Sequence, residues 1–145
     1  LQNGEIDAAI IANQPTESNL QGDILYYEQF FGYVAHNESI FKKDLIRTAD
    51  INDERLWLLD EGHCFRDQLM RFCQMEKVKV RQAAYRLGSL ETFMRMVESG
   101  NGITFIPELA TLQLSKEQKE LVRPPFPSRH GRSSLSPVKI LSGIP

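Results

Sequence analysis

The alternation of short apolar runs with helical patterns between residues 56 and 106 constrains the fold most. The first unit is the apolar run Leu56–Leu59, followed by a turn over 60–63 and a helical pattern over Cys64–Met75. The second unit is a helix that begins at Ser89 and ends at Gly100, followed by the apolar run Ile103–Ile106, which ends at Pro107. Runs of this length predict strands, and Leu56–Leu59, bounded by charge, is typical of a strand buried on both faces. Strands that alternate with helices predict an α/β architecture with a mainly parallel sheet.

The first 35 residues predict strands on either side of a loop. Residues 1–4 are typical of the last turn of a helix ended by glycine, and Ile6–Ala12 is a continuous run of small and β-branched residues. We expect that run to be a buried strand. Residues 13–22 are rich in Pro, Ser, Thr, Asn and Gly and predict a loop. Ile24–Ala35 then predicts strands that are interrupted at Gly32.

Three further segments complete the expected organisation. Residues 39–52 predict a short polar helix and a linker, and residues 78–87 predict a strand. Within the helix from Ser89, an apolar stripe at i, i+3, i+4 and i+7 predicts core or dimer-interface packing; its members are Leu90, Phe93, Met94 and Val97. From Pro124 onward the composition shifts to Pro, Ser, Arg and Gly, and we expect no core residue there before Val138.

Composition places the chain among ordinary globular proteins. Its 145 residues suffice for one domain or a pair of small lobes, and 41% hydrophobic with 25% charged residues excludes a disordered chain. The longest apolar run, Ala8–Ala12, is too short to span a bilayer, so we expect no membrane partner. The net charge of −2, without a cluster of Lys and Arg, predicts that this chain alone does not bind DNA.

The number of cysteines indicates the cellular compartment in which the protein is expected. Two cysteines are too few for a secreted disulfide scaffold, and the residues after Leu1 lack the basic and apolar segments of a signal peptide. We therefore expect a cytoplasmic protein, in which a disulfide is more often transient and regulatory than structural. The start at Leu1 rather than at Met also predicts that the sequence is a fragment of something longer.

The spacing of Cys64 and Cys73 predicts that the reduced and the disulfide-bonded forms have different structures. The two residues lie nine positions apart, which on a continuous helix gives about 13.5 Å of rise, with the side chains on opposite sides. A disulfide needs Cα atoms roughly 4.4 to 6.8 Å apart. If the helix is correct, forming that bond must unwind or rebuild the segment, and this is how covalent chemistry can produce a two-state switch.

The two thiols also lie in different predicted settings. Cys64 falls in the first turn of the helix, where the positive end of the dipole favours the thiolate, close to His63 and Arg66. Cys73 falls on an apolar stripe, where burial favours the neutral thiol; the stripe contains Phe65, Leu69 and Phe72. A reactive thiolate and a sheltered thiol are the parts needed for peroxide chemistry, in which a sulfenic acid condenses with a second thiol.

Two other interpretations of the cysteines stay open. From spacing alone, the favoured one is that both cysteines are small hydrophobic residues that pack in a core. Metal ligation by His63, Cys64 and Cys73 matches no common zinc pattern and lacks a fourth ligand, so we expect no metal and no cofactor. His36 and His130 are isolated and are expected on the surface or in loops.

Three regions of the sequence resemble one known family. Residues 59–73, with a G-H-C-x-R-D-Q core, resemble the redox motif of the OxyR-type hydrogen-peroxide sensors among the LysR-type transcriptional regulators. Residues 88–92 and 96–107 resemble a second signature stretch of the same regulatory domain. Residues 1–10, with the form L-x-x-G-x-I-D-A-A-I, are similar to the wider LysR-type pattern. The resemblance covers residues 1–125.

This resemblance implies a two-lobed α/β regulatory domain that is Rossmann-like and similar to the periplasmic binding proteins. Residues 1–35 would belong to a truncated first lobe, residues 36–122 would form the second lobe with the redox cysteines, and residues 123–145 would return to the first lobe. Residues 128–145 do not resemble the strand and terminal helix of the family, which predicts an atypical or truncated end. The family's winged helix-turn-helix DNA-binding domain is absent from this chain.

The resemblance also implies roles for residues around the motif. Cys64 would be the peroxide-reactive cysteine and Cys73 the resolving one, while His63, Arg66 and Asp67 would shape the pocket around the reactive sulfur. On a regular helix the side chain of Arg66 would diverge from Cys64. Its role therefore requires an irregular helix, or one that starts after Cys64.

The function that the resemblance implies is a peroxide-responsive regulator of oxidative-stress genes, not an enzyme. Its partners would be hydrogen peroxide, further copies of the chain in a homodimer or homotetramer, promoter DNA through the missing domain, and RNA polymerase. A second hypothesis is a domain that binds a small anion between its lobes, with Ser89 at a helix N-terminus as the effector-pocket candidate. A thiol peroxidase with catalytic turnover is a third.

Overall fold

The computed structural model describes residues 5–12, 20–47, 50–51, 56–59, 66–69, 89–125 and 135–143. Along the chain, the elements are β1 (Ala8–Ile11), β2 (Leu20–Val34), η1 (Ser39–Lys42), α2 (Leu90–Glu98), β3 (Ile103–Pro107), η4 (Glu108–Gln113), α3 (Lys116–Lys119), β4 (Val122–Arg123) and β5 (Leu135–Gly143). A helical turn over residues 66–69 lies between η1 and α2 in the sequence. Within the described residues, no helix is long and apolar enough to cross a membrane.

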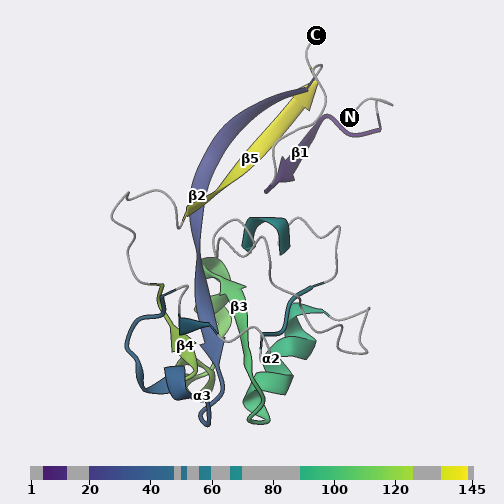
Figure 1. The fold of residues 1–145 in the computed structure, drawn as a ribbon. Coiled ribbons are helices and arrows are strands. Elements are labelled where there is room, and N and C mark those ends of the chain that lie inside the picture. The colour runs from purple at the N-terminus through teal and green to yellow at the C-terminus, as the bar shows by residue number, and fades with distance from the viewer. Residues whose placement is uncertain are drawn as a thin grey trace.

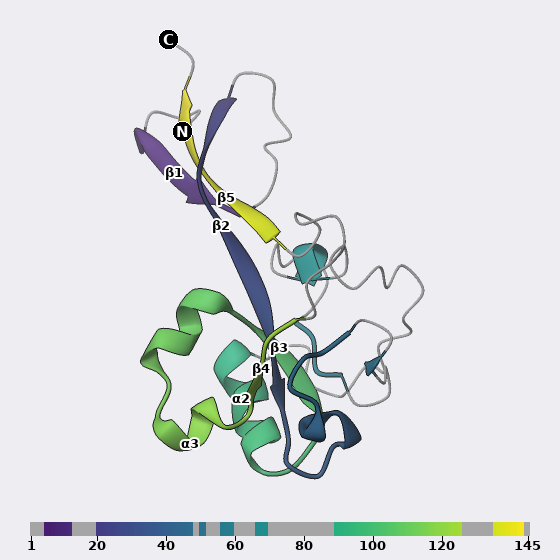
Figure 2. The same ribbon diagram turned by 90° about the vertical axis from the view of Figure 1, so that its left-hand side faces the viewer.

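β2 is a 15-residue strand that takes part in two ladders (Figure 1). Residues 20–29 pair with β5, and β5 pairs with β1 on its other edge; we call these three segments the upper ladder. Residues 30–34 pair with β3, and Gly32 and Tyr33 also pair with β4; we call these segments the lower ladder. Figure 2 shows β2 running from one ladder to the other, with α2 and α3 beside the lower one. The predicted lobe boundaries stay predictions.

The pairings between these strands are all antiparallel. Among the described residues, parallel contacts are limited to the isolated bridges Ile46–Pro125 and Leu56–Ile103. The prediction of a mainly parallel sheet is therefore wrong for this part of the chain. The reason is that strand direction depends on how the chain returns to its partner over a long separation, which a local pattern does not specify.

The N-terminal strand is present as β1, inside the predicted range 6–12, but it is not buried. Ile6 is 52% exposed and Ile10 is 68% exposed. The cause is that, among the described strands, β1 contacts only β5 and lies at an edge. The predicted loop over 13–22 is wrong for residues 20–22, which belong to β2.

Gly32 does not interrupt β2, contrary to the prediction of separate strands over Ile24–Ala35. This residue is buried between β3 and β4. A Cβ atom at this position would overlap the Cδ1 methyl of Ile46. Glycine is needed here because Ile46 packs directly against the backbone, and the strand continues through it.

The middle of the chain follows the sequence prediction in part. Residues 39–52 begin with the short helix η1, as predicted. The strand predicted over Leu56–Leu59 is reduced to one bridge, between Leu56 and Ile103. Beside it, the Trp57 N–H donates to Ile103 O at 2.8 Å, and Trp57 O accepts from the Thr104 hydroxyl at 3.0 Å. Residues 66–69 are helical, which confirms that part of the predicted helix. Predictions on residues 1–4, 60–63 and 78–87, and on the rest of that helix, lie outside the described residues.

α2 lies where the sequence predicts it. Ser89 caps its N-terminus by accepting a hydrogen bond from the Thr92 N–H at 3.2 Å. At the other end Gly100 has a φ of +95°, which favours glycine in a helix-ending turn. The predicted apolar stripe lies in the core: Phe93 and Val97 are buried, and Leu90 and Met94 pack against the cluster that contains Val97.

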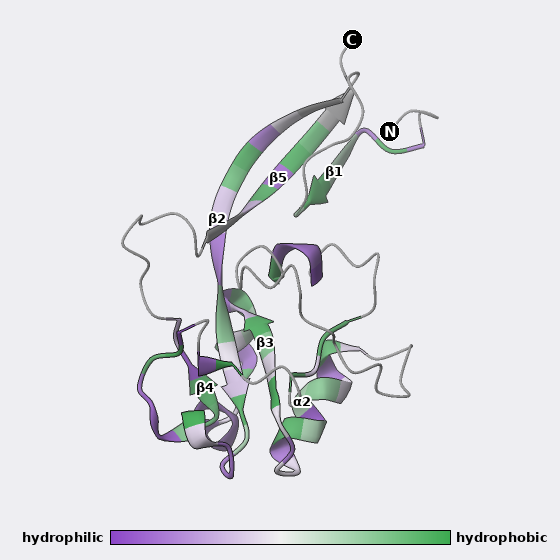
Figure 3. Ribbon diagram, viewed as in Figure 1, coloured by the Kyte–Doolittle hydropathy of each residue, from purple (hydrophilic) through white to green (hydrophobic). Residues whose placement is uncertain are grey.

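The lower ladder is buried on both faces because alternate residues of β2 and β3 point to opposite sides. One face carries the lower core cluster, which consists of Phe30, Val34, Ile40, Ile46, Leu56, Leu69, Ile103 and Phe105. The other face carries a second cluster of Tyr33, Ala35, Val97, Ile106 and Leu121. Figure 3 shows the hydrophobic character of β3 between these two clusters.

β5 lies at the centre of the upper ladder, between β1 and β2. Although residues 128–145 do not resemble the family's strand in sequence, residues 135–143 form one. Val138 and Leu141 are 7% and 5% exposed. The core therefore resumes at Val138, as the composition predicts.

Candidate functional site

The predicted redox residues fall partly outside the described residues. Cys64, Cys73 and His63 are not among them, so their geometry and their roles stay predictions. Arg66 and Asp67 are described and lie on the helical turn over residues 66–69. The structure therefore places the turn between the two cysteines and not the cysteines themselves.

This turn sends its side chains in different directions. Leu69 is buried, with 1% of its surface exposed, and belongs to the lower core cluster. Arg66 is half-buried and Asp67 is exposed. Gln68 donates a hydrogen bond from its Nε2 to the backbone oxygen of Ala12, directly after β1. The turn between the cysteines thus contacts both the lower core and the end of an upper-ladder strand.

Ser89, the effector-pocket candidate, is exposed and serves as a helix cap. Its hydroxyl oxygen accepts from the Thr92 N–H and lies 3.1 Å from the Thr92 hydroxyl. These contacts explain why serine precedes the helix, since an N-cap oxygen satisfies one of the free N–H groups of the first turn. A role in binding an anion stays a prediction.

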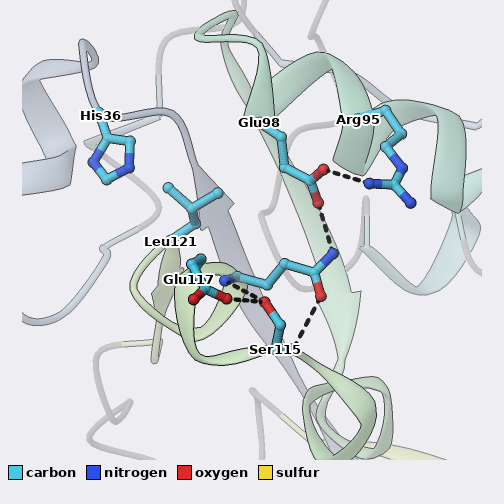
Figure 4. A pocket seen from close by; sticks show the side chains of 7 residues that line it. His36, Arg95, Glu98, Ser115, Glu117 and Leu121 are labelled. Atoms are coloured by element: carbon cyan, nitrogen blue, oxygen red, sulfur yellow. Dashed lines mark hydrogen bonds and ion pairs between the residues drawn. The ribbon is translucent and has the colours of Figure 1, made fainter.

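A pocket that sequence reasoning missed lies between the end of α2 and α3 (Figure 4). It has a volume of about 480 Å³ and is lined by His36, Arg95, Glu98, Ser115, Glu117, Gln118 and Leu121. Glu98, one of these residues, accepts three hydrogen bonds: from Tyr33 Oη at 3.0 Å, from Gln118 Nε2 at 2.8 Å and from Arg95 Nη1 at 3.0 Å. The carboxylate therefore joins β2, α2 and α3.

The electrostatics of this network follow from the three donors. Burial acts to raise the pKa of Glu98, but the hydrogen bonds from Gln118, Tyr33 and Arg95 outweigh it, so this pKa lies below its ordinary value. Burial, with the neighbouring Glu98 carboxylate, raises the pKa of Tyr33 well above its ordinary value. Both shifts keep Glu98 charged and Tyr33 neutral at physiological pH.

The chemistry of this pocket is that of a packed polar network. Gln118 donates to Glu98 and accepts from the backbone N–H of Ser115 at 3.0 Å, so its amide is held at both ends. In the sequence Glu98 lies three positions after Arg95, within the stretch 96–107 that resembles the family's second signature, but neither the pattern nor the resemblance gave it a role. Among the described residues, no group of three or more His, Cys, Asp or Glu side chains is placed to hold a metal ion.

The sequence and the fold match a known family of domains. The family model for the LysR substrate binding domain matches residues 1–136. The chain therefore belongs to the LysR substrate-binding domain family. This membership confirms the predicted class, a two-lobed α/β domain like the periplasmic binding proteins.

Within that family, the similar proteins are OxyR proteins and peroxide-inducible activators. The hydrogen peroxide-inducible genes activator of Haemophilus influenzae is 33% identical over 113 residues, which cover 77% of this chain and 37% of the relative. The DNA-binding transcriptional dual regulator OxyR of Escherichia coli K12 is 33% identical over 110 residues, covering 76% and 36%. The chain spans just over a third of the length of these relatives.

Solved structures extend the likeness over almost the whole chain. The crystal structure of an OxyR mutant from Porphyromonas gingivalis is 52% identical, has a TM-score of 0.83, and covers 99% of this chain and 64% of that one. The reduced form of the OxyR regulatory domain from Pseudomonas aeruginosa is 29% identical with a TM-score of 0.76, covering 98% and 66%. The resemblance to the OxyR-type regulatory domains is thereby confirmed, and these relatives are named as transcriptional regulators, not as enzymes.

Proposed function

We propose that the chain is the redox-sensing regulatory domain of a peroxide-responsive transcriptional regulator, which switches by a reversible disulfide between Cys64 and Cys73. The observation that carries the proposal is the 52% identity to an OxyR structure over 99% of the chain. The only two cysteines of the sequence lie in the stretch 59–73 that resembles the OxyR redox motif. The curated relatives are named as hydrogen peroxide-inducible activators, which supports peroxide as the signal.

The proposed reaction takes two electrons from the two thiols. The Cys64 thiolate attacks one oxygen of hydrogen peroxide, the O–O bond breaks, and uptake of a proton leaves a sulfenic acid and one water. The sulfur of Cys73 then attacks the sulfenic sulfur and forms the S–S bond. The sulfenic hydroxyl leaves with the Cys73 proton as a second water, so one peroxide is reduced and one disulfide forms.

Three neighbours would support this chemistry. His63 and Arg66 would favour the Cys64 thiolate through their positive charge, and Asp67 would help to shape the pocket. Arg66 is half-buried and Asp67 is exposed in the structure.

The whole regulator would act in the cytoplasm as a homodimer or homotetramer. Promoter DNA would be bound by a winged helix-turn-helix domain outside residues 1–145, and RNA polymerase would be the downstream partner. The net charge of −2 supports a division of labour in which this chain senses and another domain binds DNA.

A second candidate function is binding of a small anion between the lobes, and the family's description as a substrate binding domain favours it. In that case the exposed N-terminus of α2, capped by Ser89, would face the anion. Substitution of Cys64 distinguishes the two functions. A Cys64→Ser variant would bind the anion as the unmodified protein does, whereas it would lose every response to peroxide.

Mass spectrometry after a stoichiometric dose of peroxide and alkylation tests the proposal. We expect a rapid Cys64–Cys73 crosslink in the unmodified chain and a trapped sulfenic acid at Cys64 in the Cys73→Ser variant. The Cys64→Ser variant is the matched control, and its Cys73 should stay alkylatable. If both thiols stay alkylatable at that dose in the unmodified chain, the peroxide proposal is wrong.

A further inference from the structure

The upper and lower ladders are joined by a side-chain contact as well as by β2 itself. We propose that Glu28 is a latch between them: its carboxylate caps the start of η4 from the upper ladder and so restrains the angle between the two ladders. The latch involves residues of β2 and η4 alone, and it does not depend on the proposed redox function. Any rotation of one ladder against the other at this junction has to open it.

The backbone of β2 does not fix that angle by itself, because β2 changes its partner at one step. Gln29 is the last residue paired with β5, opposite Leu135, and Phe30 is the first paired with β3, opposite Pro107. Within the described residues, no strand pairs with β2 on both sides of this step (Figure 2). The twist between neighbouring strands varies widely, so a single strand can bend or twist here unless side chains restrain it.

η4 begins without a cap from its own neighbours in the sequence. Its N-cap residue, Pro107, has no side-chain oxygen and makes no side-chain cap hydrogen bond. The first N–H groups of a helix have no partner inside the helix. Glu28 Oε1 accepts a hydrogen bond from the Leu109 N–H at 3.1 Å, across a separation of 81 positions. The carboxylate therefore supplies the missing cap, and its charge suits the positive end of the helix.

The two ends of this hydrogen bond belong to different ladders. Glu28 is half-buried and is paired with Ser136 of β5, in the upper ladder. η4 is held to the lower ladder, because Ala110 and Leu114 pack against the second cluster on β2 and β3. Rotation of the upper half of β2 would carry the Glu28 carboxylate away from the Leu109 N–H. A hydrogen bond weakens steeply as its angle and length depart from the optimum, so this contact opposes the rotation.

Nuclear magnetic resonance of the 145-residue chain, kept in the dithiol form with a reductant, tests the latch through two measurements. Residual dipolar couplings report the orientation of each ladder, and hydrogen exchange reports the protection of the Leu109 amide. In the unmodified chain, one alignment tensor should fit both ladders. In Glu28→Ala, we expect the upper ladder to need a separate tensor of smaller magnitude, and the Leu109 amide to exchange roughly three- to tenfold faster.

Glu38→Ala is the matched control. Glu38 Oε1 accepts a hydrogen bond from the Gly102 N–H, also at 3.1 Å, but Glu38 follows the lower end of β2 and Gly102 precedes β3. This bond therefore lies on the lower-ladder side alone. Its loss should speed exchange of the Gly102 amide and leave one alignment tensor for both ladders. Glu28→Gln keeps an acceptor oxygen and should behave as the unmodified chain does.

Glu28→Thr replaces Glu28→Ala if the alanine variant fails to fold, because a β-branched residue suits a strand and also lacks the carboxylate. One tensor for both ladders in these variants would overturn the proposal, since the angle would then be fixed without Glu28. Unchanged exchange of the Leu109 amide would overturn it as well, because the cap would then contribute nothing. An equal change of alignment in Glu38→Ala would assign the effect to a general loss of stability and not to a latch.

Discussion

The two halves of β2 both carry large apolar and aromatic side chains but lie in opposite environments. In the upper ladder Ile24, Tyr26 and Tyr27 are 49%, 41% and 48% exposed, whereas in the lower ladder Phe30 and Tyr33 are 2% and 0% exposed. Both halves are rich in large apolar and aromatic residues. The difference teaches that burial in this chain is set by what packs against the strand and not by the strand's own residues.

The packing partners differ between the ladders. The lower ladder has the turn over residues 66–69 and η1 on one face and α2 on the other, which gives two core clusters. The upper ladder has strand partners and two hydrogen bonds to helical segments, from the Leu109 N–H of η4 to Glu28 at 3.1 Å and from Gln68 to the backbone oxygen of Ala12. Val138 and Leu141, in its central strand, are nevertheless buried. The lower ladder is thus a folded core that surrounds the intercysteine turn.

The largest expected difference between the ladders is the effect of a truncated apolar side chain. Phe105→Ala, in the lower core cluster, should lower the free energy of unfolding by about 3–5 kcal/mol. Ile10→Ala, on the exposed edge strand β1, should change it by less than about 0.5 kcal/mol. Denaturant unfolding of the two variants measures both effects. Similar losses would show that the upper ladder is as well packed as the lower one.

A smaller effect is expected where a side chain is added to the lower ladder. Gly32→Ala places a methyl group against Cδ1 of Ile46, and overpacking of this kind costs about 1–3 kcal/mol. Combining it with Ile46→Val, which removes the opposing methyl, should restore part of the loss. The same denaturant titration applies, and a fully additive double variant would argue against direct contact between the two positions.

The helix beside the lower ladder should lose about 1 kcal/mol without its cap. In Ser89→Ala the hydrogen bond to the Thr92 N–H disappears, whereas Ser89→Asp retains an acceptor. Thermal unfolding should therefore show a lower Tm for the alanine variant only. Equal Tm values for all three proteins would show that the cap contributes nothing to stability.

Glu98→Gln is expected to change the free energy of unfolding only slightly at neutral pH. The pH dependence of that change is more informative than its size. The folded-state pKa of Glu98 lies below its ordinary value, so its contribution to stability is present above pH 4.5 and is lost as the pH falls through the folded-state pKa. Glu98→Gln should cost less than about 1 kcal/mol at pH 7 and should flatten the acid loss of stability. If stability falls with decreasing pH in the same way in the unmodified protein and in Glu98→Gln, Glu98 is not the source of that loss.

The sequence predicted those parts of the fold that depend on nearby residues. α2 was predictable because its cap, its apolar stripe and Gly100 all lie within twelve residues. The exposed state of β1 and the continuity of β2 through Gly32 were not, because they depend on the position of β1 at the edge of the described strands and on the distant Ile46. Local sequence patterns indicate which side chains are suited to burial. They do not indicate which distant segment packs against those side chains.

The candidate site shows the same limit. The sequence identifies the cysteines and their neighbours through a specific motif, and it places Leu69 on an apolar stripe. It does not reveal that Leu69 packs with Phe30 and Ile103, or that Gln68 reaches Ala12, because those contacts join segments more than thirty residues apart. The Glu98 network was missed because two of its donors, Tyr33 and Gln118, come from β2 and α3 rather than from the helix that carries Glu98.

Hydrogen exchange measured by mass spectrometry, on the dithiol form and on the form oxidised with stoichiometric peroxide, tests the central claim most directly. The account predicts a Cys64–Cys73 disulfide and faster exchange in peptides that cover residues 66–69 of the oxidised form, with little change in β5 of the upper ladder. Identical exchange of residues 66–69 in the two forms would contradict it, because the redox step would then leave the turn between the cysteines in place.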